Sequence, residues 1–219
     1  DGINPLDIAF RDAVRSGVTC VMSGPGSNNV VGGRNIAVKT FGTIIDKMVI
    51  KNPAGVKIAL GENPLGTYGI SDRCPVTRMG SAALIRELFM RTEDYIARKE
   101  NGKLEERDIR LEAVIPVLKN EIPLRAHAHR ADDIVTVVRI AEEFNISKLV
   151  IEHGTEAHLI KDYLKEKNIP VAFGPILTPR IKLELKARQS YSIVELVEAG
   201  IKTALITDHP YNSIDRLKT

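Results

Sequence analysis

Histidine is concentrated in the second half of this 219-residue chain. All five histidines lie between positions 127 and 209, and none occurs in the first 126 residues. They are His127, His129, His153, His158 and His209. Imidazole is the commonest protein ligand of transition metals, and it also transfers protons near neutral pH. The clustering therefore points to a metal site or an acid–base site in this half of the chain.

The run of residues 125–130, Arg-Ala-His-Ala-His-Arg, places two histidines two positions apart. On an extended strand such residues face the same side, so His127 and His129 can point together at a metal. If the strand ends at His127, however, His129 belongs to the following loop and is free to contact a substrate. The sequence leaves both interpretations open.

Two further strand ends carry comparable groups. His153 is followed by Gly154, which lets the backbone turn sharply, and Asp208 closes the last predicted strand. Imidazole and carboxylate groups that meet at one face from separate parallel strands are the ligand set of a catalytic zinc-type site with an open position for water. His158 is predicted to point outward from the next helix in a structural role. His209 is not assigned as a ligand, because on a continued strand it would face away from Asp208.

The elements that must position these residues alternate between strand and helix patterns. Core strands are predicted at 18–22, 56–60, 123–127, 148–152, 170–173 and 201–207. Helices are predicted at 5–15, 81–99, 106–119, 131–144, 156–167 and 192–199. Two small extra strands, 36–41 and 47–51, form an excursion that the segment 53–55 ends. A loop at 61–64 leads into an irregular stretch up to Met79, and Pro116 is expected to kink or break its helix.

This alternation favours a parallel sheet covered by helices, in either a doubly wound or a barrel arrangement. Polar residues follow the carboxyl ends of several predicted strands, which is where a (β/α)8 barrel builds its active site. Only six core strands are predicted, with one excursion strand as a candidate seventh. The predicted fold is therefore an α/β, TIM-like (β/α)8 barrel that is incomplete or distorted.

Composition excludes several classes of protein. The 31 Lys and Arg residues against 28 Asp and Glu give a net charge of +3, and these charges are scattered, so no nucleic-acid partner is expected. Cys20 and Cys74 are the only cysteines, too few for a disulfide framework, which favours a reducing, cytoplasmic location. No stretch approaches the ~20 apolar residues of a membrane span. We expect a small-molecule substrate and no membrane partner, and a homo-oligomer stays open.

Four segments together resemble the metal-dependent amidohydrolase superfamily. They are Gly17-Val-Thr-Cys-Val-Met22, Arg125-Ala-His-Ala-His129, Ile151-Glu-His-Gly-Thr155 and Ala204-Leu-Ile-Thr-Asp-His-Pro210. Their order is most similar to that of the imidazolonepropionase-related branch, which also includes Xaa-Pro dipeptidase-like and cyclic-amide hydrolases. The resemblance covers nearly the whole chain and implies a distorted (β/α)8 barrel with metal ligands on strands one, five, six and eight.

The resemblance also implies a role for each candidate residue. His127 would be the fifth-strand metal ligand and His153 the sixth-strand ligand, although in relatives with one metal the latter contacts substrate. Asp208 would bind metal and take a proton from the attacking water. His129 and Arg130 stand where relatives orient the substrate. The implied cofactor is a divalent metal, zinc by preference, with iron, manganese and cobalt as other candidates.

Relatives with two metals bridge them with a carboxylated lysine or a glutamate. Lys57 and Glu62 are the candidates here, and Glu62 is favoured because it lies beyond the strand end, at the level of the other ligands. The family's first-strand His-x-His would precede residue 1, and its C-terminal helices and β-sandwich would follow Thr219. We therefore expect residues 1–219 to be a single catalytic barrel domain, truncated at both ends, that is weak in metal binding or inactive when isolated.

The implied function is hydrolysis of a non-peptide or cyclic amide C–N bond by a metal-activated water. Asp208 would act as general base and then as general acid, and His153 or His129 would stabilise the oxyanion. The first alternative is an aminohydrolase (deaminase) acting on an amidine or a nucleobase-like substrate. It ranks second because His129 and Arg130 occupy the neighbourhood where such relatives often carry a glutamate. The other alternative is a non-catalytic barrel fragment.

Overall fold

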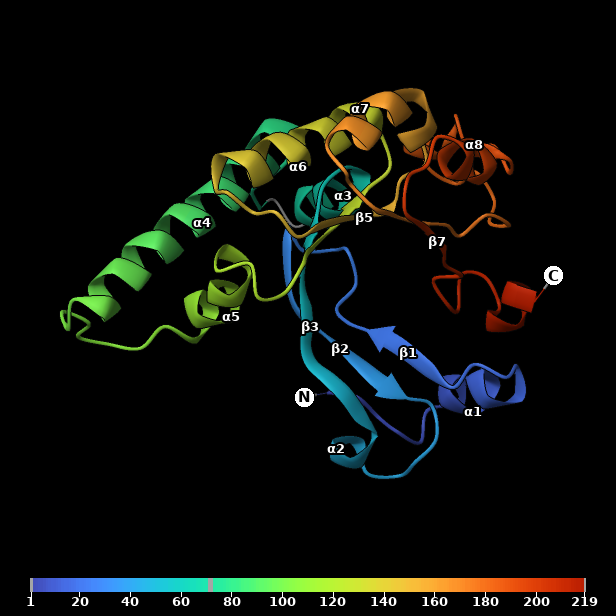
Figure 1. The fold of residues 1–219 in the computed structure, drawn as a ribbon, viewed down its shortest axis with the longest axis horizontal. Coiled ribbons are helices and arrows are strands. Elements are labelled where there is room, and N and C mark those ends of the chain that lie inside the picture. Colours follow the sequence, from blue (N-terminus) through green and yellow to red (C-terminus); the bar gives the residue numbers. More distant parts are fainter. Residues whose placement is uncertain (1, 71–72, 219) are drawn as a thin grey trace.

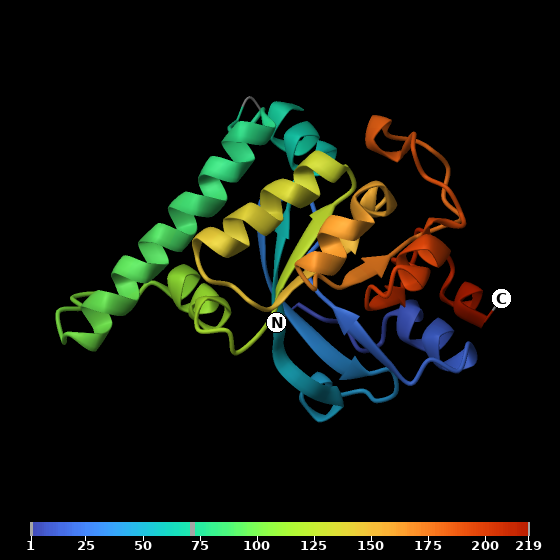
Figure 2. The same ribbon diagram turned by 45° about the horizontal axis from the view of Figure 1, so that its top comes forward.

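The framework is one curved sheet, seen in a computed structural model that describes residues 2–70 and 73–218. Its strands are β1 (Cys20–Ser23), β2 (Val31–Lys39), β3 (Val49–Ala59), β4 (Leu124–Ala128), β5 (Leu149–His153), β6 (Val171–Phe173) and β7 (Thr203–Leu205). They lie side by side in chain order, antiparallel from β1 to β3 and parallel from β3 to β7. The sheet curls into a half-barrel (Figures 1 and 2), in agreement with the predicted α/β class and incomplete barrel.

Helices follow the strands as the alternation predicted. They are α1 (Ile8–Arg15), α2 (Ile45–Met48), α3 (Glu62–Ile70), α4 (Arg78–Glu100), α5 (Ile109–Leu118), α6 (Ala131–Glu143), α7 (Lys161–Glu166) and α8 (Ser192–Glu198), with short 3-10 turns η1 (Ala157–Ile160), η2 (Leu183–Leu185) and η3 (Ile214–Lys218). Helices α4, α6 and α7 lie on one face of the parallel strands (Figure 1). Within the described residues, no helix combines the length and the apolar character that crossing a membrane requires.

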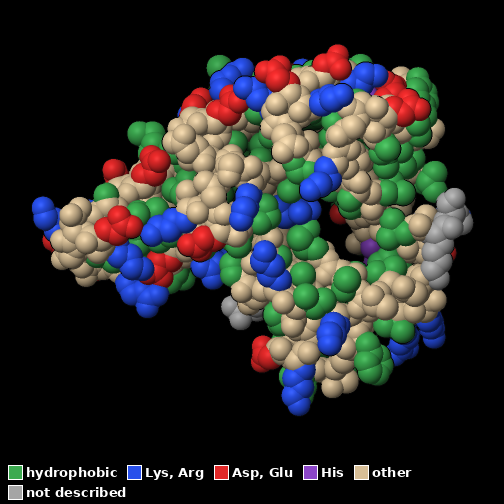
Figure 3. All heavy atoms as spheres, in the orientation of Figure 1, with side chains coloured by type: hydrophobic (Ala, Val, Ile, Leu, Met, Phe, Trp, Pro, Cys, Tyr) green, Lys and Arg blue, Asp and Glu red, His purple; other side chains and the backbone are tan. Residues whose placement is uncertain are grey.

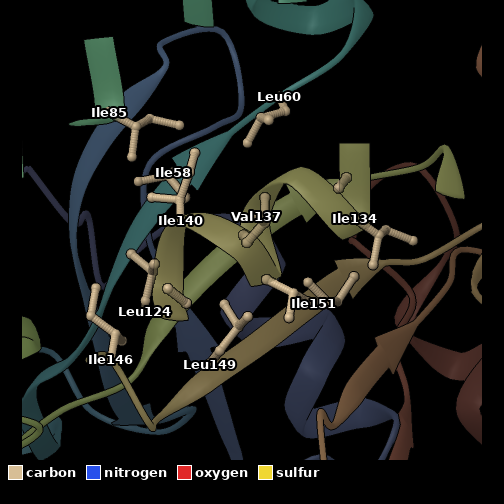
Figure 4. Packing of buried hydrophobic residues seen from close by; sticks show 14 of the residues in the cluster. Ile58, Leu60, Ile85, Leu124, Ile134, Val137, Ile140, Ile146, Leu149 and Ile151 are labelled. Carbon is tan, nitrogen blue, oxygen red and sulfur yellow. The ribbon is translucent and has the colours of Figure 1, made fainter. Parts of the chain in front are cut away.

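The core fills the space between the parallel strands and these helices (Figure 4). Ile58 of β3 and Ile151 of β5 lie across from the same residue of β4, Ala126, and both are fully buried against the helical layer. Ile85 of α4 and Ile140 of α6 complete this layer. Since side chains alternate between the faces of a strand, the residues between these apolar positions must face the inside of the half-barrel.

The N-terminal strands differ from their predictions. The segment 18–22 was predicted to be a buried strand, but β1 is half-exposed because it lies at the edge of the sheet and, of the described strands, pairs with β2 alone. The excursion strand at 47–51 and the core strand at 56–60 are one continuous strand, β3, so the segment 53–55 does not end an excursion. Bulges in the β2–β3 register accommodate this segment, where a proline is tolerated.

Two predicted segment boundaries are also corrected. A loop and an irregular stretch were predicted after Gly61, but the structure has helix α3 there. Residues 71 and 72 of the predicted stretch lie outside the described residues. The first helix begins at Ile8 and not at residue 5. Asp7 caps it by accepting a hydrogen bond from the backbone N–H of Ala9 at 2.9 Å.

Pro116 does not break its helix, because it lies in the last turn of α5. A proline leaves one carbonyl four residues earlier without an intrahelical donor. That carbonyl, of Glu112, accepts a hydrogen bond from Arg34 Nη2 at 3.3 Å. The helix predicted at 156–167 is η1 followed by α7, and His158 in η1 is buried, contrary to the outward position predicted for it.

Candidate metal centre

Three histidines leave the ends of β4 and β5 toward the inside of the half-barrel. His127 belongs to the inward-facing set of β4, and His129 continues that set one residue past the strand end. On β5, His153 lies two residues after Ile151, which faces the helices, so His153 would also face the helices if the strand stayed regular. Its positive φ of 72° turns it out of that pattern, so the third imidazole reaches the same side.

The three imidazoles form one compact, buried group, which we call the histidine cluster. One ring nitrogen of each lies within 4.8 Å of one ring nitrogen of each of the others. The ring centroids are 4.8 Å apart for His127 and His129, 4.5 Å for His127 and His153, and 5.0 Å for His129 and His153. Their exposed fractions are only 2 to 5%. Such convergence of neutral nitrogen donors is what a transition metal requires.

Hydrogen bonds fix two of the rings. His153 Nδ1 lies 2.7 Å from the carbonyl oxygen of Gly174, to which it donates. His129 Nδ1 lies 2.7 Å from Thr155 Oγ1. Because Nδ1 of each ring is engaged in a hydrogen bond, Nε2 of both rings is left available. A histidine that ligates a metal typically has its other ring nitrogen held by a hydrogen bond in this way.

Among residues 2–70 and 73–218, neither ring nitrogen of His127 has a hydrogen-bond partner, although the ring is buried. Buried polar atoms are nearly always satisfied, so an unpartnered pair needs an explanation. A divalent cation held by the histidine cluster would be the missing partner of His127. The residues present therefore fit such an ion.

A glycine is required where the backbone supports His153. Gly174 has a φ of 138°, and a Cβ built there would lie 2.1 Å from the backbone oxygen of Ile206. A larger residue would displace the carbonyl that His153 binds. The segment after β6 is thus shaped by contact with the segment after β7.

The environment keeps the histidine cluster unprotonated. Burial lowers the pKa of His127 well below its usual value, and the neighbouring imidazoles add to the shift. Burial, together with the charges of His153 and Lys182, lowers the pKa of His129 to about 2. Burial also lowers the pKa of His153, against the opposing charge of Asp208. Neutral imidazole is the form that binds metal.

These lowered pKa values predict that the metal-free protein loses stability in acid. Below pH ~6.5 the unfolded chain binds protons that the folded histidine cluster does not, so the free energy of unfolding decreases as the pH falls. For His127 and His129 the expected loss is about 1.4 kcal/mol per pH unit for each ring. Urea denaturation of chelator-treated protein between pH 7.5 and 5 measures it. The His127→Gln variant should show a shallower slope, and an unchanged slope would contradict the assignment.

The histidine cluster opens into a pocket of about 80 Å³. Its polar lining also includes Ser27, Asn63, Thr155, Lys182 and Asp208, and its apolar lining includes Phe173, Ile181 and Leu185. Asp208 is an exposed residue that follows β7 by three positions and has a φ of 51°. In Figure 3 a histidine side chain is visible at the hollow between the parallel part of the sheet and strands β1 and β2. A carboxylate and three imidazoles therefore share one small pocket.

Comparison with known proteins bears on this site. No family model matches the chain. Over 188 residues it is 27% identical to a protein named amidohydrolase tasK from Hapsidospora irregularis, a match covering 75% of this chain and 19% of that protein. The crystal structure of an amidohydrolase from Thermotoga maritima MSB8 matches with a TM-score of 0.95 and 47% identity, covering 98% of this chain and 57% of that one.

The chain is similar to amidohydrolases in sequence and in fold. It spans a little over half the length of the solved relative and about a fifth of the curated one. The similarity agrees with the amidohydrolase resemblance at its broad level.

The two candidates for a metal bridge are both engaged elsewhere. Lys57 forms an ion pair with Glu152, whose other carboxylate oxygen lies 2.7 Å from Arg125 Nε. Although burial raises the pKa of Glu152, these two cations hold it below its ordinary value. Glu62 is the first residue of α3, and its Oε1 accepts a hydrogen bond from the backbone N–H of Glu184 at 3.0 Å. Glu62 is not a member of the histidine cluster.

Arg130 does not line the pocket in this structure. Its guanidinium binds Asp132 at 2.8 and 2.9 Å at the start of α6. Three residues that contact the histidine cluster had no role assigned to them from the sequence: Thr155, Gly174 and Glu184, whose Oε1 lies 3.7 Å from His129 Nε2. Thr155 and Gly174 lie close after the strand ends, and that position is the one signal by which they could have been found.

Proposed function

We propose that the protein hydrolyses an amide-type C–N bond with a divalent metal held by the histidine cluster. The observation that carries this proposal is His127, a buried imidazole whose two ring nitrogens have no hydrogen-bond partner among the described residues and which lines a pocket together with His129 and His153. The names of the two amidohydrolase relatives support the same reaction class.

When bound, the metal would polarise the substrate carbonyl and lower the pKa of water toward ~7. The Gly174 carbonyl and the Thr155 hydroxyl hold the rings of His153 and His129 in place, so the donors need no reorganisation. Asp208 faces the same pocket, and its carboxylate accepts the proton of the attacking water and passes it to the leaving nitrogen. Phe173 and Leu185 limit the water that reaches the reacting atoms.

The finer assignments are part of the same proposal. We infer zinc as the metal, because three imidazoles are a common ligand set for it. We infer a small cyclic amide as substrate, supported by the resemblance to imidazolonepropionase-related enzymes. A cytoplasmic location is supported by Cys20 and Cys74, which are free and exposed.

The test combines metal content with a substrate panel on the full-length protein. We expect near-stoichiometric metal in the purified protein, hydrolysis of cyclic amides such as hydantoins and lactams, loss of hydrolysis with a chelator, and recovery with zinc. Ammonia release from amidines and nucleobases, measured in parallel, would instead favour the aminohydrolase. Metal-free protein that stays inactive after zinc is supplied would overturn the proposal.

A further inference from the structure

One wall of the pocket is formed by a basic segment. The chain between β6 and α8 carries four cationic side chains against one acid, Glu184; they are Arg180, Lys182, Lys186 and Arg188. Of these four, Lys182 alone has a described carboxylate within ion-pair distance, at 3.9 Å. Burial lowers the pKa of Arg188, and the positive charge of Arg180 adds to the shift. Positive charge is therefore in excess beside the pocket.

Lys182 is the cation of this segment that faces the pocket. It belongs to the pocket lining, and its side chain is 27% exposed. Burial is the main cause of the lowered pKa values of His127 and His129, and the charge of Lys182 adds to both shifts, which indicates that its ammonium lies near these rings. The arginines bind within the segment instead, since Arg180 donates to the backbone oxygen of Arg188 at 2.8 Å.

The ammonium of Lys182 is held in place but has donors to spare. Its Nζ donates a hydrogen bond to Asn63 Oδ1. The carboxylate oxygen of Glu184 that lies 3.9 Å away is beyond hydrogen-bond distance. An ammonium group carries three N–H donors, so two of them have no acceptor among the described residues. These two donors can bind a ligand in the pocket.

Three separate parts of the fold fix the position of this ammonium. Ser27 belongs to the loop between β1 and β2, Asn63 to the first turn of α3, and Lys182 to the segment after β6, and all three line the pocket. Asn63 Nδ2 donates to Ser27 Oγ at 2.6 Å, which turns the amide oxygen of Asn63 toward the ammonium. A charge held in this way loses little conformational freedom when a ligand binds.

The charges that line the pocket favour an anionic ligand at Lys182. Apart from the histidine cluster, the charged side chains of the lining are Lys182 and Asp208. The imidazoles are neutral, so positive charge is in excess when a divalent ion is bound. Asp208 is assigned to the reacting water, which leaves Lys182 for the substrate. In a pocket of about 80 Å³, one ammonium matches a small, singly charged group such as a carboxylate.

We propose that Lys182 binds a carboxylate group of the substrate, so that the protein prefers amides carrying a carboxylate to neutral ones. The inference rests on the proposed function, because it defines the substrate of the same pocket. Asn63 and Ser27 position the ammonium. A carboxylate held by Lys182 fixes the orientation of the scissile amide relative to the histidine cluster and Asp208.

The competing explanation is that Lys182 only compensates the charge of the buried Glu184. In that case Lys182→Met would change stability and leave the preference among substrates unchanged. Lys182→Arg keeps the positive charge and serves as the conservative variant. Lys186 offers a matched control, because it is an exposed lysine of the same segment that does not line the pocket.

The experiment compares two hydantoins on the full-length protein, one with an acetate side chain and one with an acetamide side chain of nearly the same size. Calorimetry gives the dissociation constant of each compound from chelator-treated protein, and ring opening by zinc-loaded protein gives kcat/KM. The wild type should prefer the acetate compound by about 10- to 100-fold in both measurements, the contribution of a hydrogen bond between charged groups. Lys182→Met should bring both ratios close to one. Lys182→Arg should keep part of the preference, and Lys186→Met all of it.

Three results would overturn the inference alone. The first is a wild type that binds both compounds equally or binds neither, and the second is a preference that survives in Lys182→Met. The third is an equal loss of preference in Lys186→Met, which would mean that the charge of the whole segment acts and not a contact of Lys182. A Lys182-dependent preference in binding, in a protein that opens neither ring after zinc is supplied, would overturn the proposed function and support the carboxylate site.

Discussion

Replacing His127 by alanine is expected to abolish tight metal binding while the protein stays folded. The imidazole is buried and central in the histidine cluster, with ring centroids 4.5 and 4.8 Å from those of its two neighbours. In the part of the chain that the structure describes, no hydrogen bond depends on its ring nitrogens, since neither has a partner there. The loss of metal affinity should exceed the roughly 10- to 100-fold that outer-shell changes produce. Metal content by mass spectrometry and titration with Zn²⁺ measure it.

His158 provides a matched control for this variant. It is also a buried histidine with an unpartnered ring nitrogen, but it lies in η1 and outside the histidine cluster. His158→Ala should keep full metal content, and circular dichroism should show that both variants are folded. Retention of metal by His127→Ala, or equal loss in the two variants, would contradict the metal centre.

The parallel half of the fold could be predicted because its strands are short and apolar on the helical side. Strands β4, β5 and β6 each begin one residue after the predicted start, and α6 matches its prediction to within one residue. The antiparallel half could not be predicted in the same way. Its strands lie near or at the sheet edge, where burial no longer marks them, and a proline lies inside β3.

The candidate site could be predicted only where it depends on the alternation of side chains between the two faces of a strand. This alternation places His127 inside the half-barrel, and it places His129 there too when it is extended one residue beyond the strand end. The turn at His153 depends on a positive φ, which no property of histidine indicates. Glu184 could not be found at all, because it lies in an irregular segment and is 122 residues from Glu62, its hydrogen-bond partner.

Asp208→Asn should reduce turnover strongly while leaving metal content intact. The carboxylate lines the pocket beside the histidine cluster but is not part of it, so the ion keeps its imidazole ligands in the variant. Asparagine has nearly the same shape, yet its amide does not accept a proton at neutral pH. Loss of a positioned general base typically costs about 10²- to 10⁴-fold in rate. The measurement is kcat on the best amide of the substrate panel, with metal content determined on the same sample.

Asp215 is the control for this variant, because it is an exposed aspartate in η3 that does not line the pocket. Asp215→Asn should leave kcat unchanged. Near-normal turnover in Asp208→Asn would exclude the carboxylate as the proton acceptor. Loss of metal together with turnover would instead make Asp208 a ligand, as the amidohydrolase resemblance implies. The two roles are separable in this protein because its imidazoles converge without the help of Asp208, so that metal content reports the ligands and kcat reports the base.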